Sequence, residues 1–309
     1  MTRPPTCVIY NPAAGRGRAA RRFTALRRDY AGVAEFRPTE RPGHAIELAY
    51  AAARRGFERV VAFGGDGTVH EVANGILASG LTDVVFATWP GGSMNDYAFS
   101  TGLKGWWVGQ PAVPPQTVQA DVLRIWDGRR ERFAVNGFGF GFNGAVTVES
   151  RKIRRLRGHL LYATAFLRAA WWKYATPLVT VNIDGQEIVD QTLAFSVSVG
   201  QREGGFRLFP NARLDDGWAD ILFVGAVKRW ELARYLPGLL AGRLPVGHPH
   251  LRTGVCRAAR VMSETPLCAH ADGELICTPE DAVHELSVEL CPGRLRVEVC
   301  PTSRPVIGG

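Results

Sequence analysis

The chain of 309 residues contains no apolar run of 18 residues and no Cys-x-x-Cys pair. The first absence argues against a transmembrane helix, which needs about 20 consecutive apolar residues. The second argues against a zinc site, because zinc ligands are commonly supplied by such pairs. The N-terminus also lacks the apolar region of a signal peptide, so we expect a cytoplasmic protein with reduced thiols in its core.

Acidic residues are the scarcer charge: 29 Asp and Glu stand against 37 Lys and Arg, which gives a net charge of +8. The basic residues form two clusters, at residues 16–28 and 151–157. Such clusters attract phosphates, nucleic acid or an anionic membrane surface, or they simply form a solvated surface. No nucleic-acid-binding module is recognisable, so we expect no nucleic-acid partner. A homodimer is left open.

The length predicts about two domains of roughly 150 residues each. In residues 1–117, short apolar runs alternate with helical patterns, which is typical of a doubly wound α/β domain with a parallel sheet. The expected strands are residues 7–10, 33–36, 59–63 and 83–89. The expected helices include one ending near residue 29, one over 45–55 and one beginning near residue 68.

A glycine turn, Gly64-Gly65-Asp66-Gly67-Thr68, joins the third strand to the third helix. Glycines let a ligand approach the backbone closely, and a helix start offers N–H groups and a positive dipole end. Thr68 is a candidate N-cap of that helix. The turn therefore predicts a phosphate cradle, with a tight ligand-free turn as the alternative.

Three further loops follow the other expected strands. Asn11 follows the first strand, Thr39 the second, and residues 90–98 the fourth. Because ligands of parallel sheets bind at the carboxyl ends of the strands, these loops predict one shared nucleotide site. A weaker alternative is a dinucleotide fingerprint, formed by Gly15, Gly17 and Ala20 with Glu35 further along the chain.

Residues 118–309 predict a second domain, a mostly antiparallel β-sandwich, after a Gly/Pro-rich linker at 105–115. Its last strand is left free to return to the first domain. Asp127-Gly128 and Asp184-Gly185 predict hairpin turns, which Asp272-Gly273 resembles. The expected strands are 118–126, 131–135, 178–183, 187–199, 219–224, 255–262, 284–290 and 295–299, with helices near 151–173 and 228–241.

The helix near 151–173 combines aromatic residues with the second basic cluster. Such a helix packs on a sheet or lies on a membrane surface, and both hold if only one face is buried.

Six segments occur in an order that resembles the bacterial soluble diacylglycerol kinase and related lipid kinase family. They are residues 11–15, 64–75, 90–98, 136–142, 210–217 and 271–274. Sphingosine and ceramide kinases share the catalytic domain of this family, and NAD kinases share its Gly-Gly-Asp-Gly motif. The resemblance implies a nucleotide-binding α/β domain, a C-terminal β-sandwich and an active site between them.

The resemblance also implies roles for individual residues. Asp272 would be the general base and Glu274 its neighbour. A structural Mg²⁺ would lie on the carbonyls of Arg213 and Trp218 and on the carboxylate of Asp216. ATP would be bound by Asn11, Thr39, Gly64, Gly65, Asp66, Gly67, Thr68, Ser93 and Asn95, with catalytic Mg²⁺ arriving with ATP and Asp66 as its candidate helper.

These residue types suit the implied chemistry. A lipid hydroxyl is a poor nucleophile, so a carboxylate that accepts its proton is useful. Backbone N–H groups and Mg²⁺ position and neutralise the phosphates. Asp215-Asp216-Gly217 offers hard oxygen ligands, although chemistry alone makes a plain turn an equal alternative there.

Three residues depart from the family pattern. Met94 replaces a small residue of the second glycine loop, which bears on nucleotide affinity and preference. Asn143 takes a position where Asp is frequent, which bears on the identity of the lipid. Arg213 replaces a common Lys, which matters little if its carbonyl is the ligand.

The sequence thus predicts an ATP- and Mg²⁺-dependent kinase that converts diacylglycerol to phosphatidic acid in peripheral contact with a membrane. Two alternatives stay open. One is a kinase of another acceptor, such as a sphingoid, a polyprenol-type lipid or NAD. The other is a catalytically weak protein that binds nucleotide and lipid.

Overall fold

The computed structural model describes residues 4–16, 23, 30, 32–103, 115–153, 155–156, 158–245 and 247–300. The predicted helix ending near residue 29 and the predicted linker at 105–115 lie almost wholly outside these residues, as do parts of both basic clusters. The chain forms two compact units: Met1–Ala120 with Pro292–Gly309, and Asp121–Cys291. The predicted boundary between the domains was residue 117, and the prediction allowed the last strand to return to the first domain.

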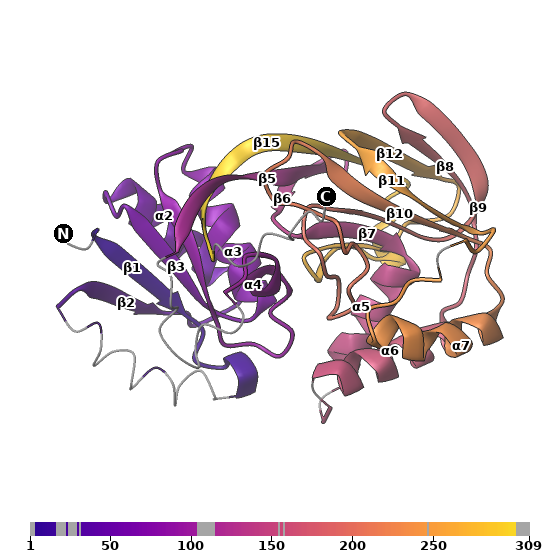
Figure 1. The fold of residues 1–309 in the computed structure, drawn as a ribbon, viewed down its shortest axis with the longest axis horizontal. Helices are drawn as coiled ribbons and strands as arrows, with labels where there is room; N and C mark the ends of the chain where they lie inside the picture. The colour runs from indigo at the N-terminus through magenta and orange to yellow at the C-terminus, as the bar shows by residue number, and fades with distance from the viewer. Residues whose placement is uncertain are drawn as a thin grey trace, which may run out of the picture. The chain divides into compact units, whose positions relative to one another are not determined.

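The first unit is a parallel sheet whose strands are connected along the chain by helices (Figure 1). Its strand order is β2 (Ala34–Pro38), β1 (Thr6–Tyr10), β3 (Arg59–Gly64) and β4 (Val85–Pro90). The end of β15 (Glu285–Val299) adds a further parallel strand, through Val297 opposite Phe86. The helical segments are η1 (Ala14–Arg16), α2 (His44–Arg54), α3 (Asp66–Ala78) and α4 (Asp96–Ser100). The predicted α/β architecture is confirmed.

Apolar strands form the core of this unit. Val8, Val61, Phe63, Ala87 and Trp89 pack together from three neighbouring strands. Their apolar runs are long because a parallel strand is covered on both faces. Gly75 allows α2 and α3 to cross closely, because a Cβ there would lie 2.3 Å from the carbonyl oxygen of Ile46.

The second unit is mostly antiparallel β (Figure 1). The long strand β9 (Gln186–Ser198) pairs with β8 (Leu178–Ile183) along its first half and with β7 (Gly137–Gly141) and β10 (Ala219–Gly225) along its second. It thus belongs to both sheets of the unit, as strands at the corner of a sandwich do. The remaining strands are β5 (Gln116–Trp126), β6 (Glu131–Ala134), β11 (Leu251–Cys256), β12 (Ala258–Ser263), β13 (Ala269–Ala271) and β14 (Glu274–Cys277), and η3 (Pro279–Asp281) follows β14.

The predicted hairpins at 118–135 and 178–199 are confirmed, as is the helix near 228–241, which is α7 (Arg229–Leu240). The single strand predicted at 255–262 was wrong. The chain changes partners at Arg257, where β11 leaves β10 and β12 joins β8. The Asp184 carboxylate accepts hydrogen bonds from the N–H groups of Arg257 and Ala258 there, at 2.8–3.1 Å.

The two strands predicted at 284–290 and 295–299 are one strand, β15, in which Gly293 adopts a φ of 59°. The helix predicted near 151–173 is two helices, α5 (Phe142–Lys152) and α6 (Gly158–Trp172). The break follows from the extended backbone of Ile153 and from Gly158, whose φ is 56°.

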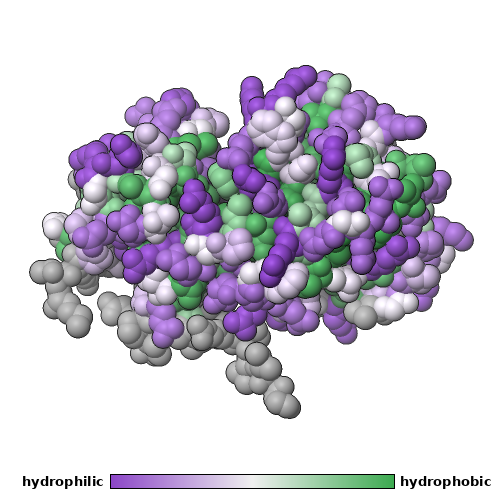
Figure 2. Space-filling model, turned by 90° about the horizontal axis from the view of Figure 1, so that it is seen from above, coloured by the Kyte–Doolittle hydropathy of each residue, from purple (hydrophilic) through white to green (hydrophobic). Residues whose placement is uncertain are grey.

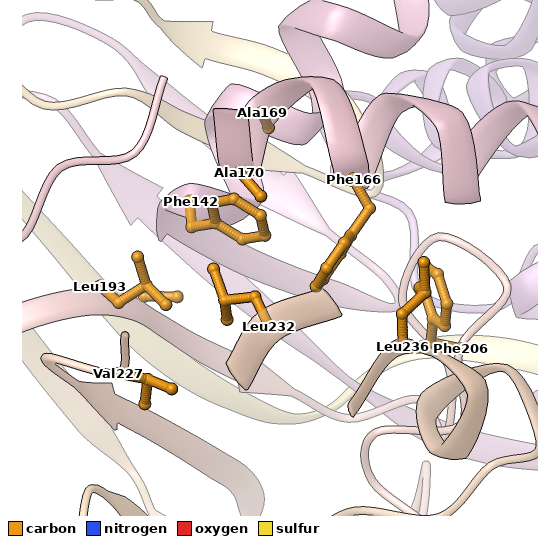
Figure 3. Close-up of a cluster of buried hydrophobic side chains, with 10 residues drawn as sticks. Phe142, Phe166, Ala169, Ala170, Leu193, Phe206, Val227, Leu232 and Leu236 are labelled. Carbon is orange, nitrogen blue, oxygen red and sulfur yellow. The ribbon is translucent and has the colours of Figure 1, made fainter. Parts of the chain in front are cut away.

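Helices α5, α6 and α7 share one buried cluster with β9 (Figure 3). Phe166 of α6 points toward Leu232 and Leu236 of α7 in that view, and Phe142 of α5 lies edge-on to Phe166 at 4.9 Å between ring centroids. The expected packing of the helix after residue 151 is therefore confirmed for one face of α6. No helix in the described part of the chain is long and apolar enough to cross a membrane.

Candidate functional site

The glycine turn after β3 leads directly into α3. The helix begins at Asp66 with Gly65 as its N-cap, so Thr68 is its third residue and is buried. The predicted N-cap role of Thr68 was wrong, because the extended Gly65 ends the turn three residues earlier. The first turn of this 13-residue helix still presents N–H groups and a positive dipole end, which favour an anion.

A second glycine loop packs against this turn. The N–H of Gly91 donates to the carbonyl of Gly64 at 2.7 Å. A Cβ on Gly92 would lie 2.4 Å from the Cα of Gly65. At these positions the glycines are needed for the close approach of one loop to the other, so that part of their role is structural.

Asp66 and Asn95 fix the second loop. The Asp66 carboxylate accepts the N–H groups of Asn95 and Asp96, at 3.0 and 2.7 Å. The Asn95 side chain bonds both the N–H and the carbonyl of Gly92, at 2.9 and 3.2 Å, and its own φ is 54°. These two side chains therefore order the backbone of the loop that starts α4.

Met94 and Ser93 point differently within this loop. Met94 is 4% exposed, whereas Ser93 is exposed. The thioether is thus part of the protein interior, and the hydroxyl lies on the outer surface of the loop. Because its side chain is buried, Met94 does not cover the outer surface of the loop.

The sheet brings all the predicted nucleotide-binding segments to one edge. Tyr10 lies opposite Pro38 and Phe63, and Gly64 lies opposite Pro90, so the four strands end level. The residues that follow are tied to the strand ends: the N–H of Asn11 bonds Phe63 at 3.0 Å, and that of Thr39 bonds Tyr10 at 2.9 Å. The Asn11 side chain also accepts the N–H of Ala13 at 2.9 Å.

The rival dinucleotide fingerprint gains no support from the described residues. Gly15 lies in the short 3₁₀ turn η1, with a φ of 59°, while Gly17 and Ala20 fall outside the described residues. Glu35, which would meet a ribose, pairs instead with Arg37 and Arg55. Burial raises the pKa of Glu35, but the hydrogen bonds and charges of these two arginines outweigh it and lower that pKa.

In the second unit, Asp272 occupies the turn between β13 and β14. Its φ is 53°, a left-handed conformation that is uncommon outside glycine. Its carboxylate accepts three backbone N–H groups, from Val135, Asn136 and Gly137, at 2.9–3.0 Å. The side chain is therefore held in one orientation by the loop before β7 and by the first residue of that strand.

Glu274 begins β14 and bonds Arg151 of α5 at 2.6 Å, with both side chains about half exposed. Sequence reasoning did not find Arg151 as its partner, because nothing in the spacing of residues 151 and 274 joins them. His270 was also missed. It lies two residues before Asp272, is 3% exposed, and its Nδ1 accepts the N–H of Gly273 at 3.3 Å.

The loop at residues 213–218 has the form of a tight turn. The Asp216 carboxylate accepts the N–H of Trp218 at 3.1 Å, and Arg213 pairs with Asp215 at 3.5 Å. Burial and the nearby charge of Asp216 raise the pKa of Asp220 to about 6. A cation would suit two neighbouring carboxylates of this kind, although no group of three His, Cys, Asp or Glu side chains in the described residues is arranged to hold a metal.

Two family models match the chain in succession. Residues 5–125 match the diacylglycerol kinase catalytic domain, and residues 137–299 match the YegS C-terminal NAD kinase beta sandwich-like domain. The chain belongs to the diacylglycerol kinase and YegS-like lipid kinase family.

Relatives with lipid kinase names match most of the chain, and solved structures share its fold. A "Probable lipid kinase YegS-like" from Stenotrophomonas maltophilia is 27% identical over 298 residues, 89% of each chain. A "Diacylglycerol kinase" from Mycobacterium tuberculosis is 29% identical over 287 residues, 87% of this chain and 88% of its own. A solved diacylglycerol kinase from Bacillus anthracis has a TM-score of 0.70 at 20% identity, over 98% of this chain and all of that one.

Proposed function

We propose that this lipid kinase uses ATP and Mg²⁺ to phosphorylate a lipid hydroxyl, that of diacylglycerol first, giving phosphatidic acid. The observation that carries the proposal is the level edge of the first unit, where Asn11, Thr39 and both glycine loops follow adjacent parallel strands. Four such loops and one helix start are suited to bind a nucleoside triphosphate.

The second unit supplies the acceptor chemistry in this proposal. The acceptor hydroxyl oxygen forms a bond to the γ-phosphorus, the bond to the bridging oxygen of ADP breaks, and the hydroxyl proton passes to the Asp272 carboxylate. Three N–H bonds orient that carboxylate. Mg²⁺ would neutralise phosphate charge, with Asp66 as its candidate helper. A structural Mg²⁺ would lie on the carbonyls of Arg213 and Trp218 and on the carboxylate of Asp216.

Asp272→Asn tests the base, and Asp184→Asn is its matched control. Asp184 also occupies an Asp-Gly hairpin turn, has a φ of 49°, and accepts backbone N–H groups. We expect Asp272→Asn to lower kcat with diacylglycerol at least about 100-fold, because proton removal is lost. Asp184→Asn should retain activity. If both variants fold, bind ATP and turn over equally, Asp272 is only a turn residue.

We also propose that the outer face of α6 contacts an anionic membrane. Leu160, Trp171 and Trp172 are 69%, 73% and 63% exposed, although the opposite face of the helix is buried. Arg168 lies over the ring of Trp172 at 5.3 Å, and Lys173 is exposed beside it. Exposed tryptophans beside cations suit the interface of an anionic bilayer. The face drawn in Figure 2 is mixed instead, with hydrophilic residues around small hydrophobic groups.

The double variant Trp171→Ala/Trp172→Ala tests this surface, with Trp126→Ala, 47% exposed on β5, as its control. Binding to vesicles of phosphatidylcholine with phosphatidylglycerol should fall in the double variant alone. Equal binding of the unaltered protein to neutral and anionic vesicles would contradict the electrostatic part, and an unaffected double variant would contradict the choice of face.

A further inference from the structure

Polar side chains from four segments of the second unit gather over Gly139. His270 of β13 and Ser196 of β9 are the direct sheet neighbours of Gly139 on either side. Residues that are paired in this way place their side chains on the same face of a sheet. Asn143 reaches the same place from the first turn of α5, and Glu203 from the loop after β9. We call these five residues the Gly139 cluster.

Gly139 is required for this gathering. A Cβ there would lie 2.8 Å from Nε2 of His270, 3.0 Å from Oε1 of Glu203 and 3.1 Å from Nδ2 of Asn143. Three polar groups thus surround the space next to Gly139 that the Cβ of any other residue would occupy.

The hydrogen bonds define the state of the cluster. Since Nδ1 of His270 accepts the N–H of Gly273, its Nε2 carries the proton and donates to Oε1 of Glu203 at 3.0 Å. The amide of Asn143 donates to the hydroxyl of Ser196. Glu203 is the one acidic side chain among these five residues.

The second carboxylate oxygen of Glu203 differs from the first. Oε2 is buried and accepts no hydrogen bond from any described residue. Buried carboxylate oxygens are normally satisfied by donors, so this atom is suited to a donor that comes from a ligand. His270 also connects the cluster to the Asp272 turn through its bond to Gly273.

We infer that the Gly139 cluster is the subsite for the acceptor head group, in which Oε2 of Glu203 accepts a hydrogen bond from an O–H or N–H donor of that head group. This inference rests on the proposed kinase activity. In diacylglycerol the one hydroxyl is the nucleophile and its proton passes to Asp272, so this acceptor offers no second donor to Oε2. A monoacylglycerol adds a second hydroxyl, and a sphingoid base adds an ammonium group.

Glu203→Gln tests the subsite, because the amide keeps the shape and places an N–H₂ group where Oε2 lies. The loss of a charge-assisted bond should raise the KM for monoacylglycerol or sphingosine about tenfold and leave the KM for ATP unchanged. Glu187→Gln, an exposed glutamate at the start of β9, is the control and should behave as the unaltered protein.

Three acceptors, diacylglycerol, monoacylglycerol and sphingosine, identify the donor. A loss confined to monoacylglycerol and sphingosine assigns the second donor of these head groups, whereas an equal loss that includes diacylglycerol would overturn the inference. An unchanged acceptor KM with every lipid, or equal changes in the KM for acceptor and ATP, would overturn the inference.

Gly139→Ala provides an independent steric test, because its methyl group would occupy the centre of the cluster. ATP binding should persist, since the predicted ATP residues belong to the other unit, while acceptor binding falls. If the unaltered protein phosphorylates no lipid, the kinase proposal fails separately. Equilibrium binding of monoacylglycerol then decides the subsite: weaker binding by Glu203→Gln supports it, and equal binding overturns it.

Discussion

Gly92 is the residue at which the two glycine loops approach most tightly. Gly92→Ala would place a methyl group 2.4 Å from the Cα of Gly65, so the backbone of one loop must move. We expect the free energy of unfolding to fall by about 1–3 kcal/mol and ATP affinity to fall at least about tenfold. Calorimetric titration with ATP and denaturant unfolding measure the two effects.

Gly254→Ala is the control for this substitution. Gly254 lies on β11, is exposed, and would bring its Cβ only to 3.6 Å from Ile221. Its ATP affinity should equal that of the unaltered protein. Normal ATP affinity in Gly92→Ala would separate the glycine loops from nucleotide binding.

Buried thiols give a second residue-scale prediction. Burial raises the pKa of Cys7 to about 11 and the pKa values of Cys256 and Cys277 to about 12. At pH 8 these thiols are protonated and therefore unreactive, while Cys291 and Cys300 are half-exposed. We expect a disulfide reagent to modify all six cysteines only after unfolding, and uniform rapid modification of the native protein would contradict this.

At this scale, the nucleotide-binding roles stay predictions, and the contacts add a structural role for the same residues. The glycines, Asp66 and Asn95 were predicted as nucleotide ligands, and the described contacts show them organising the loops. The N-cap prediction for Thr68 was wrong for a local reason. The start of a helix depends on the backbone angles of Gly65, and a glycine-rich turn permits several of them.

At the scale of elements, one carboxylate joins α5 to α6. Glu149, 3% exposed at its side chain, bonds Lys152 of its own helix at 2.6 Å and Arg168 of α6 at 2.8 Å. Burial raises the pKa of Glu149, but these hydrogen bonds outweigh that effect and lower it. The two helices therefore depend on an ionised glutamate.

Arg168→Met should lower the free energy of unfolding by about 1–2 kcal/mol near neutral pH, because one bond to a buried charge is lost. A lowered pKa makes this stabilisation complete above the ordinary glutamate range, and it disappears as the pH falls through the folded pKa. Urea unfolding at several pH values measures the difference. It should shrink in acid, and the exposed control Arg234→Met should show little effect at any pH.

The elements themselves were largely predictable. Strands β1 to β4 and the two predicted hairpins were found from apolar runs and Asp-Gly turns, whereas β7, β13 and β14 were not predicted. Breaks were harder, because they depend on distant partners. The division between β11 and β12 at Arg257 is set by the carboxylate of Asp184, 73 positions earlier in the chain.

At the scale of the whole molecule, β15 contributes to both units. Its first residues pair with β12, and Val297 pairs with β4. Leu295 is 2% exposed, and Arg59 pairs with Glu298 at 2.6 Å, with both side chains 12% exposed. The first unit thus includes a strand from the far end of the sequence.

Leu295→Ala should lower the free energy of unfolding by about 3 kcal/mol, because a buried side chain is removed from the first unit. Leu290→Ala alters the same strand within the second unit. Hydrogen exchange should accelerate in β3 and β4 for Leu295→Ala, and in β8 and β12 for Leu290→Ala. The same exchange pattern in both variants would show that the units unfold together.

The path of β15 also determines when each unit can fold during protein synthesis. Residues 121–291 all leave the ribosome before the strand that completes the first unit. The second unit can therefore close first, although the first unit is begun earlier. Until residues near Val297 emerge, the sheet of the first unit exposes β4 as an open edge, which is the kind of surface that chaperones protect.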